Sequence, residues 1–149
     1  MPLAFRPREL LLLGGRSNPT LAGFAASLGG VRVTYLPEVS VEHASELLIT
    51  CSFGWLDYFT HGGVPLPVIL KSSSFASFCA HGVIPVFPQG GTKITISEDT
   101  LPGPYFVEGV NAALPSPAES AHVAREIYEW YHRRAALPLL SKRIAAAIA

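Results

Sequence analysis

A lysine followed by three serines is the part of this sequence best suited to bind a charged ligand. These residues, which stand directly before the apolar segment FASFCAHG, are Lys71, Ser72, Ser73 and Ser74. The spacing of the bulky residues predicts a helix from Ser73 to His81. The first N–H groups of a helix lack an intrahelical acceptor and attract anions, and the hydroxyl and ammonium groups add further donors. The pattern is suited to a phosphate site, although a serine cap beside a solvated lysine is the commoner arrangement for such residues.

A second glycine-rich turn, GGRSNP, follows the first apolar run of the chain. Gly14 and Gly15 would let a ligand approach the backbone, and the guanidinium of Arg16 can bond two phosphate oxygens at once. The turn lacks the GxGxxG spacing of dinucleotide sites, so an ordinary glycine turn is its alternative. Both turns follow predicted strands. We expect them on one rim of one sheet, which favours a shared anion site.

Strands and helices alternate along the sequence and predict the framework that would hold these turns. The predicted strands are 9–15, 31–37, 49–56, 68–70, 83–87 and a short one within 104–109. The predicted helices are 19–28, 41–48, 73–81 and two terminal helices within 117–149. Such alternation is typical of an α/β fold. We expect a Rossmann-like, mostly parallel sheet flanked by helices, forming a single lobe over residues 1–149.

The composition indicates a globular chain. It has 149 residues, 49% apolar and 15% charged, with a mean hydropathy of +0.34. That value indicates apolar surface that faces another domain or subunit. Eleven basic residues balance eleven acidic ones, which excludes the broad positive field of a nucleic-acid binder. No apolar run is long enough to span a membrane and no signal peptide is recognised, so a cytoplasmic location is expected.

The two cysteines and five histidines do not indicate a metal site. Cys51 and Cys79 lie in unrelated segments, and we expect both to be buried free thiols. The histidines have no ligand spacing, and the carboxylates form no cluster suited to a hard cation. No metal is therefore expected.

The order of the segments resembles the C-terminal lobe of GT-B-fold glycosyltransferases, in the retaining group that includes glycosyl transferases family 1 and sucrose synthase-like enzymes. That family holds its nucleotide-sugar donor with a strand–loop–helix of the pattern S-G-x…A-x-A-x-G-x-P-V. The residues that match the second half of this pattern are Ala80, Gly82, Pro85 and Val86. The order of elements matches over most of the chain, whereas the specific motif covers about twenty residues.

The resemblance implies a lobe that binds the diphosphate of a nucleotide-sugar for hexosyl transfer to an unidentified acceptor. The residues that would hold the diphosphate are Lys71, Ser72, Ser73, Ser74, Gly15 and Arg16. The residues that would lie against the nucleoside are Tyr35, Leu36 and Val39. The nucleotide-sugar is the donor substrate in this family, and no further cofactor is implied.

The chain departs from the family in two respects. The positions of the family's paired glutamates fall near Ile69 and Ser77, which are not acidic. An acceptor lobe does not fit into 149 residues, so we expect a lobe that is incomplete at its N-terminal strand, either a fragment or half of a two-chain enzyme. The acceptor lobe would then come from another chain or a missing segment, and the isolated chain would be inactive.

A non-catalytic interaction domain is the alternative function. It would keep the α/β scaffold, having lost donor binding, and would form a homo-oligomer or a hetero-complex through the surface FGWLDYFTHGGVPLP (residues 53–67). The missing glutamates and the high apolar content favour it. A receiver-like or flavodoxin-like domain fits less well, because Asp57 alone is available for the acidic cluster of a receiver.

Overall fold

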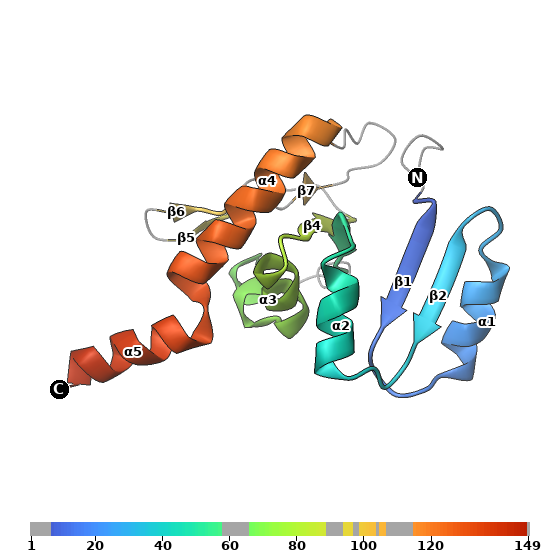
Figure 1. Ribbon diagram of the computed structural model, residues 1–149, viewed down its shortest axis with the longest axis horizontal. Coiled ribbons are helices and arrows are strands. Elements are labelled where there is room, and N and C mark those ends of the chain that lie inside the picture. The colour runs from blue at the N-terminus through green and yellow to red at the C-terminus, as the bar shows by residue number, and fades with distance from the viewer. Residues whose placement is uncertain are drawn as a thin grey trace. The chain divides into compact units, whose positions relative to one another are not determined.

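The computed structural model describes residues 7–57, 66–88, 94–96, 99–103, 105–106 and 115–148. The chain divides into two compact units, residues 1–47 and residues 48–149, and each is described by itself (Figure 1).

Unit 1 is a parallel pair of strands with two helices. Its elements are β1 (Glu9–Leu13), α1 (Pro19–Ser27), β2 (Arg32–Leu36) and α2 (Val41–Leu48), the last residue of which begins unit 2. The register of the pair runs from Glu9 opposite Arg32 to Leu13 opposite Leu36. Gly14 and Gly15 follow β1 with φ of 82° and 72°, a conformation that favours glycine and ends the strand.

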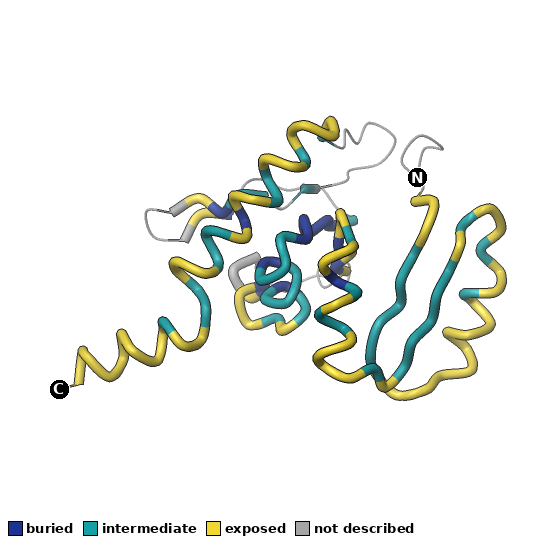
Figure 2. Tube along the Cα trace, viewed as in Figure 1, coloured by how far each residue is buried: buried dark blue, intermediate teal, exposed yellow. Residues whose placement is uncertain are grey.

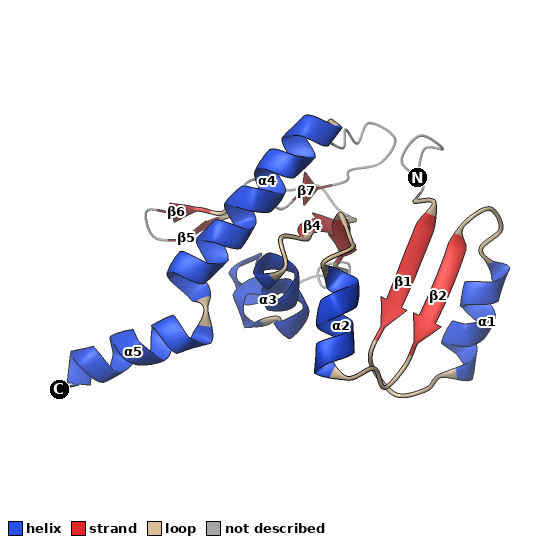
Figure 3. Cartoon of the chain, viewed as in Figure 1, coloured by secondary structure: helices blue, strands red, loops and turns tan. Residues whose placement is uncertain are grey.

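Unit 2 contains a three-stranded parallel sheet and most of the helices. Its elements are β3 (Phe53–Trp55), the 3-10 helix η2 (Leu66–Lys71), α3 (Ser73–Ala80), β4 (Ile84–Phe87), β5 (Thr95–Ile96), β6 (Asp99–Thr100), β7 (Tyr105–Phe106), α4 (Pro117–Trp130), the π-helical turn η4 (Tyr131–Ala135) and α5 (Leu137–Ile148). The sheet order is β3-β4-β7, and β5 and β6 form a separate antiparallel pair (Figure 3).

The hydrophobic core of the described chain lies in unit 2. Its buried members are Leu56, Ile69, Phe75, Cys79, Phe87, Ile94, Leu101 and Ile127, with Phe78, Trp130 and Tyr131 packed against them. Figure 2 shows these buried positions mainly in and around β4 and α3, whereas α5 is exposed over most of its length and has no buried residue. The core thus joins the βαβ unit β3-α3-β4 to α4.

Two glycines allow the close packing around α3. A Cβ added at Gly54 would lie 2.7 Å from Cγ of Phe78, and nearer still to two other ring carbons. Gly82 has φ of 67°, and a Cβ there would lie 3.1 Å from the carbonyl oxygen of Ala124 on α4. The N–H of Gly82 donates to Cys79 O, and that of Val83 donates to Phe78 O. This pair of bonds is a Schellman motif, which confirms the prediction that Gly82 ends the helix.

The predicted α/β class is confirmed, since helices alternate with the strands of β1-β2 and β3-β4-β7, whose pairs are all parallel. The expected arrangement of both turns on one sheet is not found, because the described parallel strands form two hydrogen-bonded sheets, β1-β2 and β3-β4-β7. The described residues therefore show an α/β fold, but not the one continuous sheet that a Rossmann-like lobe would have.

One predicted strand was wrong. Residues 68–70 belong to the 3-10 helix η2. A run of three apolar residues has no periodicity that separates strand from helix. Pro67 has a fixed φ that suits the first turn of a helix. The remaining strand and helix predictions that fall on described residues agree in type, with shifted ends; the strand predicted over 49–56 is confined to Phe53–Trp55.

Among the described residues, no helix has both the length and the apolar character needed to cross a lipid bilayer.

Candidate functional site

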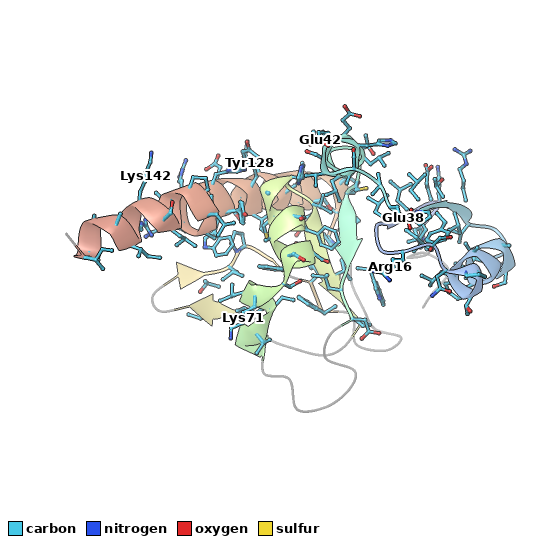
Figure 4. The ribbon with its side chains drawn as sticks, turned by 90° about the horizontal axis from the view of Figure 1, so that it is seen from below. Arg16, Glu38, Glu42, Lys71, Tyr128 and Lys142 are labelled. Atoms are coloured by element: carbon cyan, nitrogen blue, oxygen red, sulfur yellow. The ribbon has the colours of Figure 1, made fainter. Side chains whose placement is uncertain are left out.

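The start of α3 has a cation and two open backbone donors. Lys71 is the last residue of η2, is exposed, and forms no ion pair within the described part of the chain. Figure 4 shows its side chain on η2, well separated from Tyr128 on α4. No hydrogen-bond acceptor is recorded among the described residues for the N–H groups of Ser73 and Ser74. They are the first two residues of the helix, where intrahelical acceptors are absent.

Ser72 caps the helix. It has an extended backbone, with φ of −78° and ψ of 120°, and its Oγ accepts a hydrogen bond of 3.1 Å from the N–H of Phe75. Its own N–H donates to Ile69 O at 2.9 Å. The cap interpretation therefore describes Ser72, and the anion-binding potential of this segment rests on Lys71 and the two amides that follow the cap.

The far end of α3 is held by two histidines as well as by Gly82. The ring N–H at Nδ1 of His81 donates to Ser77 O at 2.7 Å; the acceptor is a carbonyl, so this nitrogen carries the proton. His132 Nε2 lies 3.2 Å from Ala80 O, and its ring lies 4.3 Å from that of Tyr128 between centroids. His132, which is exposed, thus links η4 to α3 and helps to orient the helix.

The turn after β1 is already bonded within unit 1. The hydroxyl of Tyr35 accepts from Asn18 N at 3.0 Å and donates to Arg16 O at 3.3 Å. Asn18 Oδ1 accepts from the N–H groups of Thr20 and Leu21. Pro19 has no N–H, so the first turn of α1 presents no open donor. The guanidinium of Arg16 in this turn is exposed and could meet an anion.

The residues expected against a nucleoside lie along and just after β2. Tyr35 and Leu36 are half-buried, and Leu36 pairs with Leu13. Val39 is half-buried and follows Glu38, whose φ is 55°. The N–H of Glu38 donates to Gly15 O at 2.9 Å, so the two loops of unit 1 are joined. Sequence reasoning missed the role of the Tyr35 hydroxyl, because its partners are 17 and 19 residues away.

The predicted diphosphate residues are shared between the units. Gly15 and Arg16 belong to unit 1, whereas Lys71 and the serines belong to unit 2. Their joint action on one ligand remains a prediction.

The described groups with a perturbed pKa are not among the predicted diphosphate residues. Burial raises the pKa of the Cys79 thiol, which makes it an inert core residue. Cys51, expected to be buried, is half-buried, and neither cysteine forms a disulfide. Burial, and secondarily the carboxylates of Glu119 and Glu126, raise the pKa of Tyr105. Within the described ranges no group of three histidines, cysteines or carboxylates could hold a metal ion.

Comparison of the chain with protein-family models, with curated proteins and with solved structures finds no match.

Proposed function

We propose that this chain is the donor-binding lobe of a GT-B-fold glycosyltransferase of the glycosyl transferases family 1 type. It binds the diphosphate of a nucleotide-sugar and acts with an acceptor lobe that is supplied by another chain or by a further segment. The observation that carries the proposal is an exposed lysine, Lys71, directly before a helix start where the N–H groups of Ser73 and Ser74 have no acceptor among the described residues.

These three donors suit the chemistry of the leaving group. A nucleoside diphosphate gains negative charge as the bond from the sugar to its terminal phosphate oxygen breaks. Backbone N–H groups at a helix start and a nearby ammonium stabilise that charge without reorganisation. The Schellman motif at Gly82 and the bonds made by His81 and His132 fix the other end of α3, which supports a preorganised role.

The resemblance to the family also predicts ligand residues in unit 1. They are Arg16, whose guanidinium can bond phosphate oxygens bidentately, and Tyr35, Leu36 and Val39, which would lie against a nucleoside. The Tyr35 hydroxyl occupies the N–H of Asn18, so in this turn the prediction relies on the arginine side chain rather than on that amide.

Titration of the full chain with UDP, GDP and ADP at low ionic strength tests the proposal. We expect one of them to bind, and Lys71→Ala to weaken that binding about tenfold, as for loss of one charge-assisted hydrogen bond. Lys142→Ala, which removes an exposed lysine on α5, is the matched control and should bind as the wild type does. Absence of binding at millimolar concentrations, or equal affinity of Lys71→Ala, would contradict the proposal.

A non-catalytic interaction domain is the second candidate, and two exposed aromatic residues favour it. Phe53 and Trp55 are 38% and 50% exposed on β3, an edge strand of the described sheet. Exposed aromatic side chains of this kind are common at protein interfaces. Gel filtration separates the candidates: an oligomer that Trp55→Ser dissociates, in a chain that binds no nucleotide, supports the second one. The rest of the surface expected to take part, residues 58–65, lies outside the described residues.

A further inference from the structure

Glu38 has a backbone conformation that residues other than glycine seldom adopt. Its φ is 55°, and within the part of the chain that the structure describes it is the one non-glycine residue with a positive φ. It follows Pro37 in the turn after β2. A turn that needs a positive φ directly after proline ordinarily has glycine or asparagine there. The backbone alone therefore disfavours a glutamate at this position, and residues held in this way are frequent at binding sites.

The carboxylate of Glu38 is open to a ligand. The residue is exposed, and its carboxylate forms no ion pair or hydrogen bond with another described residue. The main chain of Glu38 is fixed, by contrast, because its N–H donates to Gly15 O at 2.9 Å. The contact between the two loops thus sets the position of the residue and leaves its charged group available.

The same contact brings an exposed cation to the adjoining loop. Arg16 follows Gly15 in the chain, and its carbonyl oxygen accepts from the Tyr35 hydroxyl at 3.3 Å. The guanidinium of Arg16 also has no ion-pair partner among the described residues. Figure 4 shows Arg16 and Glu38 at the end of unit 1 where β1 and β2 finish. This end of the unit presents a cation and a strong hydrogen-bond acceptor that do not neutralise each other.

We propose that the Glu38 carboxylate accepts hydrogen bonds from the ribose hydroxyls of the nucleotide. A carboxylate only accepts, and its pair of oxygens suits the neighbouring 2′- and 3′-hydroxyls of ribose, which donate. Arg16 meets a phosphate oxygen, and the sugar bonded to that phosphate lies against the adjoining loop. This inference rests on the proposed function, since it assigns the ribose of the same nucleotide.

The nucleobase suits this carboxylate less well. In a nucleotide the sugar separates the base from the phosphates, so an acceptor in the loop that adjoins Arg16 is nearer to the ribose. The bases also differ in the N–H donors that they carry, whereas every ribonucleotide carries the same hydroxyls. We therefore expect discrimination between ribose and deoxyribose whichever base is bound.

Titration of the full chain with UDP, GDP and ADP, and with their 2′-deoxy analogues, tests the inference. The nucleotide that binds should lose about tenfold in affinity with its 2′-hydroxyl, as for one hydrogen bond to a charged group. Glu38→Gln should weaken binding of the ribonucleotide by a similar factor and lose most of the preference for ribose. Glu42→Gln, which removes the same charge from an exposed position on α2, is the matched control and should retain both.

The sign of the change separates a sugar contact from a general effect of charge. If Glu38 contacted no sugar, removing its negative charge beside Arg16 would strengthen binding of an anionic diphosphate. Glu38→Gly separates the contact from folding. It relieves the positive φ and should raise the urea midpoint of unfolding, yet it should weaken nucleotide binding as Glu38→Gln does.

The possible failures are distinguishable. Nucleotide binding that depends on Lys71, with equal affinity for the 2′-deoxy analogue or with tighter binding by Glu38→Gln, overturns this inference and leaves the proposed function in place. A preference for one base that Glu38→Gln removes, without a preference for ribose, also overturns it, in favour of a contact to the base. Absence of binding by all the nucleotides overturns both proposals.

Discussion

Side-chain oxygens satisfy different numbers of backbone donors at the starts of α1 and α3. Tyr35 and Asn18 together leave no open N–H at the start of α1. At the start of α3, Ser72 Oγ accepts from Phe75 N, whereas the amides of Ser73 and Ser74 have no acceptor within the described part of the chain. The same kind of sequence, a polar cap before a short helix, therefore has different anion-binding capacity in the two units, and the proposed diphosphate site lies at α3.

Gly54 is the residue whose substitution should affect the fold most directly. Gly54→Ala places a Cβ within the ring of Phe78, and such overpacking lowers the free energy of unfolding by about 1–3 kcal/mol. Gly23→Ala is the control, because a Cβ at Gly23 meets no atom within 4 Å and alanine favours the helix by about 0.5–1 kcal/mol. Urea unfolding measures both. If Gly54→Ala and the wild type have the same free energy of unfolding, the Phe78 ring can move aside without loss of stability, and the prediction is wrong.

At the scale of elements, α4 is stabilised at its start by a reciprocal pair of hydrogen bonds. Glu119 N donates to Ser116 Oγ at 3.3 Å, and Ser116 N donates to Glu119 Oε2 at 2.8 Å. Hydrogen bonds to the Glu119 carboxylate, first from the side chain and then from the backbone of Ser116, lower the pKa of this carboxyl below 4.5. This reciprocal pair of bonds, a capping box, stabilises the start of α4, the helix that contributes Ile127 to the core.

This lowered pKa has a defined effect on stability. Because the folded chain favours the carboxylate, the contribution of Glu119 is fully present above the ordinary pKa of 4.5 and is lost as the pH falls through the lower, folded-state value. Glu119→Gln should therefore reduce the acid sensitivity of unfolding below that pH. Ser116→Ala, which removes the cap itself, should lower stability by about 1 kcal/mol at neutral pH. Thermal unfolding from pH 7 to pH 3 compares the variants; identical pH profiles of Glu119→Gln and the wild type would refute this account.

At the scale of the whole molecule, the two units differ in how they bury apolar surface. All members of the core cluster lie in unit 2. In the described part of unit 1 the apolar residues of β1 and β2 are half-buried at most, and α1 has no buried residue. Unit 2 should therefore supply most of the free energy of unfolding.

Thiol labelling at Cys79 reports the opening of unit 2, since this side chain is fully buried. In a Cys51→Ser background, Cys79 should react only when unit 2 opens. Ile127→Ala removes buried methyl groups beside it and should accelerate labelling about thirtyfold or more, as expected for a loss of at least about 2 kcal/mol. Ile144→Ala, at an exposed position of α5, makes the same chemical change outside the core and should leave the rate unaltered. Rapid labelling of Cys79 in the native chain would contradict the burial on which this expectation depends.

The amino-acid sequence by itself determined the features that depend on neighbouring residues. Asn18 and Ser116 cap their helices, Gly82 ends α3, and Glu129 pairs with Arg133 at 3.0 Å, because each of these interactions spans no more than five residues. The alternation of strand and helix likewise predicts parallel pairing, since a helix between two strands returns the chain to the same edge.

Only the tertiary structure decided which residues far apart in the sequence come into contact. The hydroxyl of Tyr35 closes the α1 turn from 19 residues away, His132 reaches Ala80 O across 52 residues, and Phe78 fills the space above Gly54. These contacts depend on where the chain returns in space, and local spacing does not encode that path. The same holds for the apolar residues of α5, Leu137, Leu140, Ile144 and Ile148: their periodicity can be read from the sequence, but only the fold shows that unit 2 leaves them exposed.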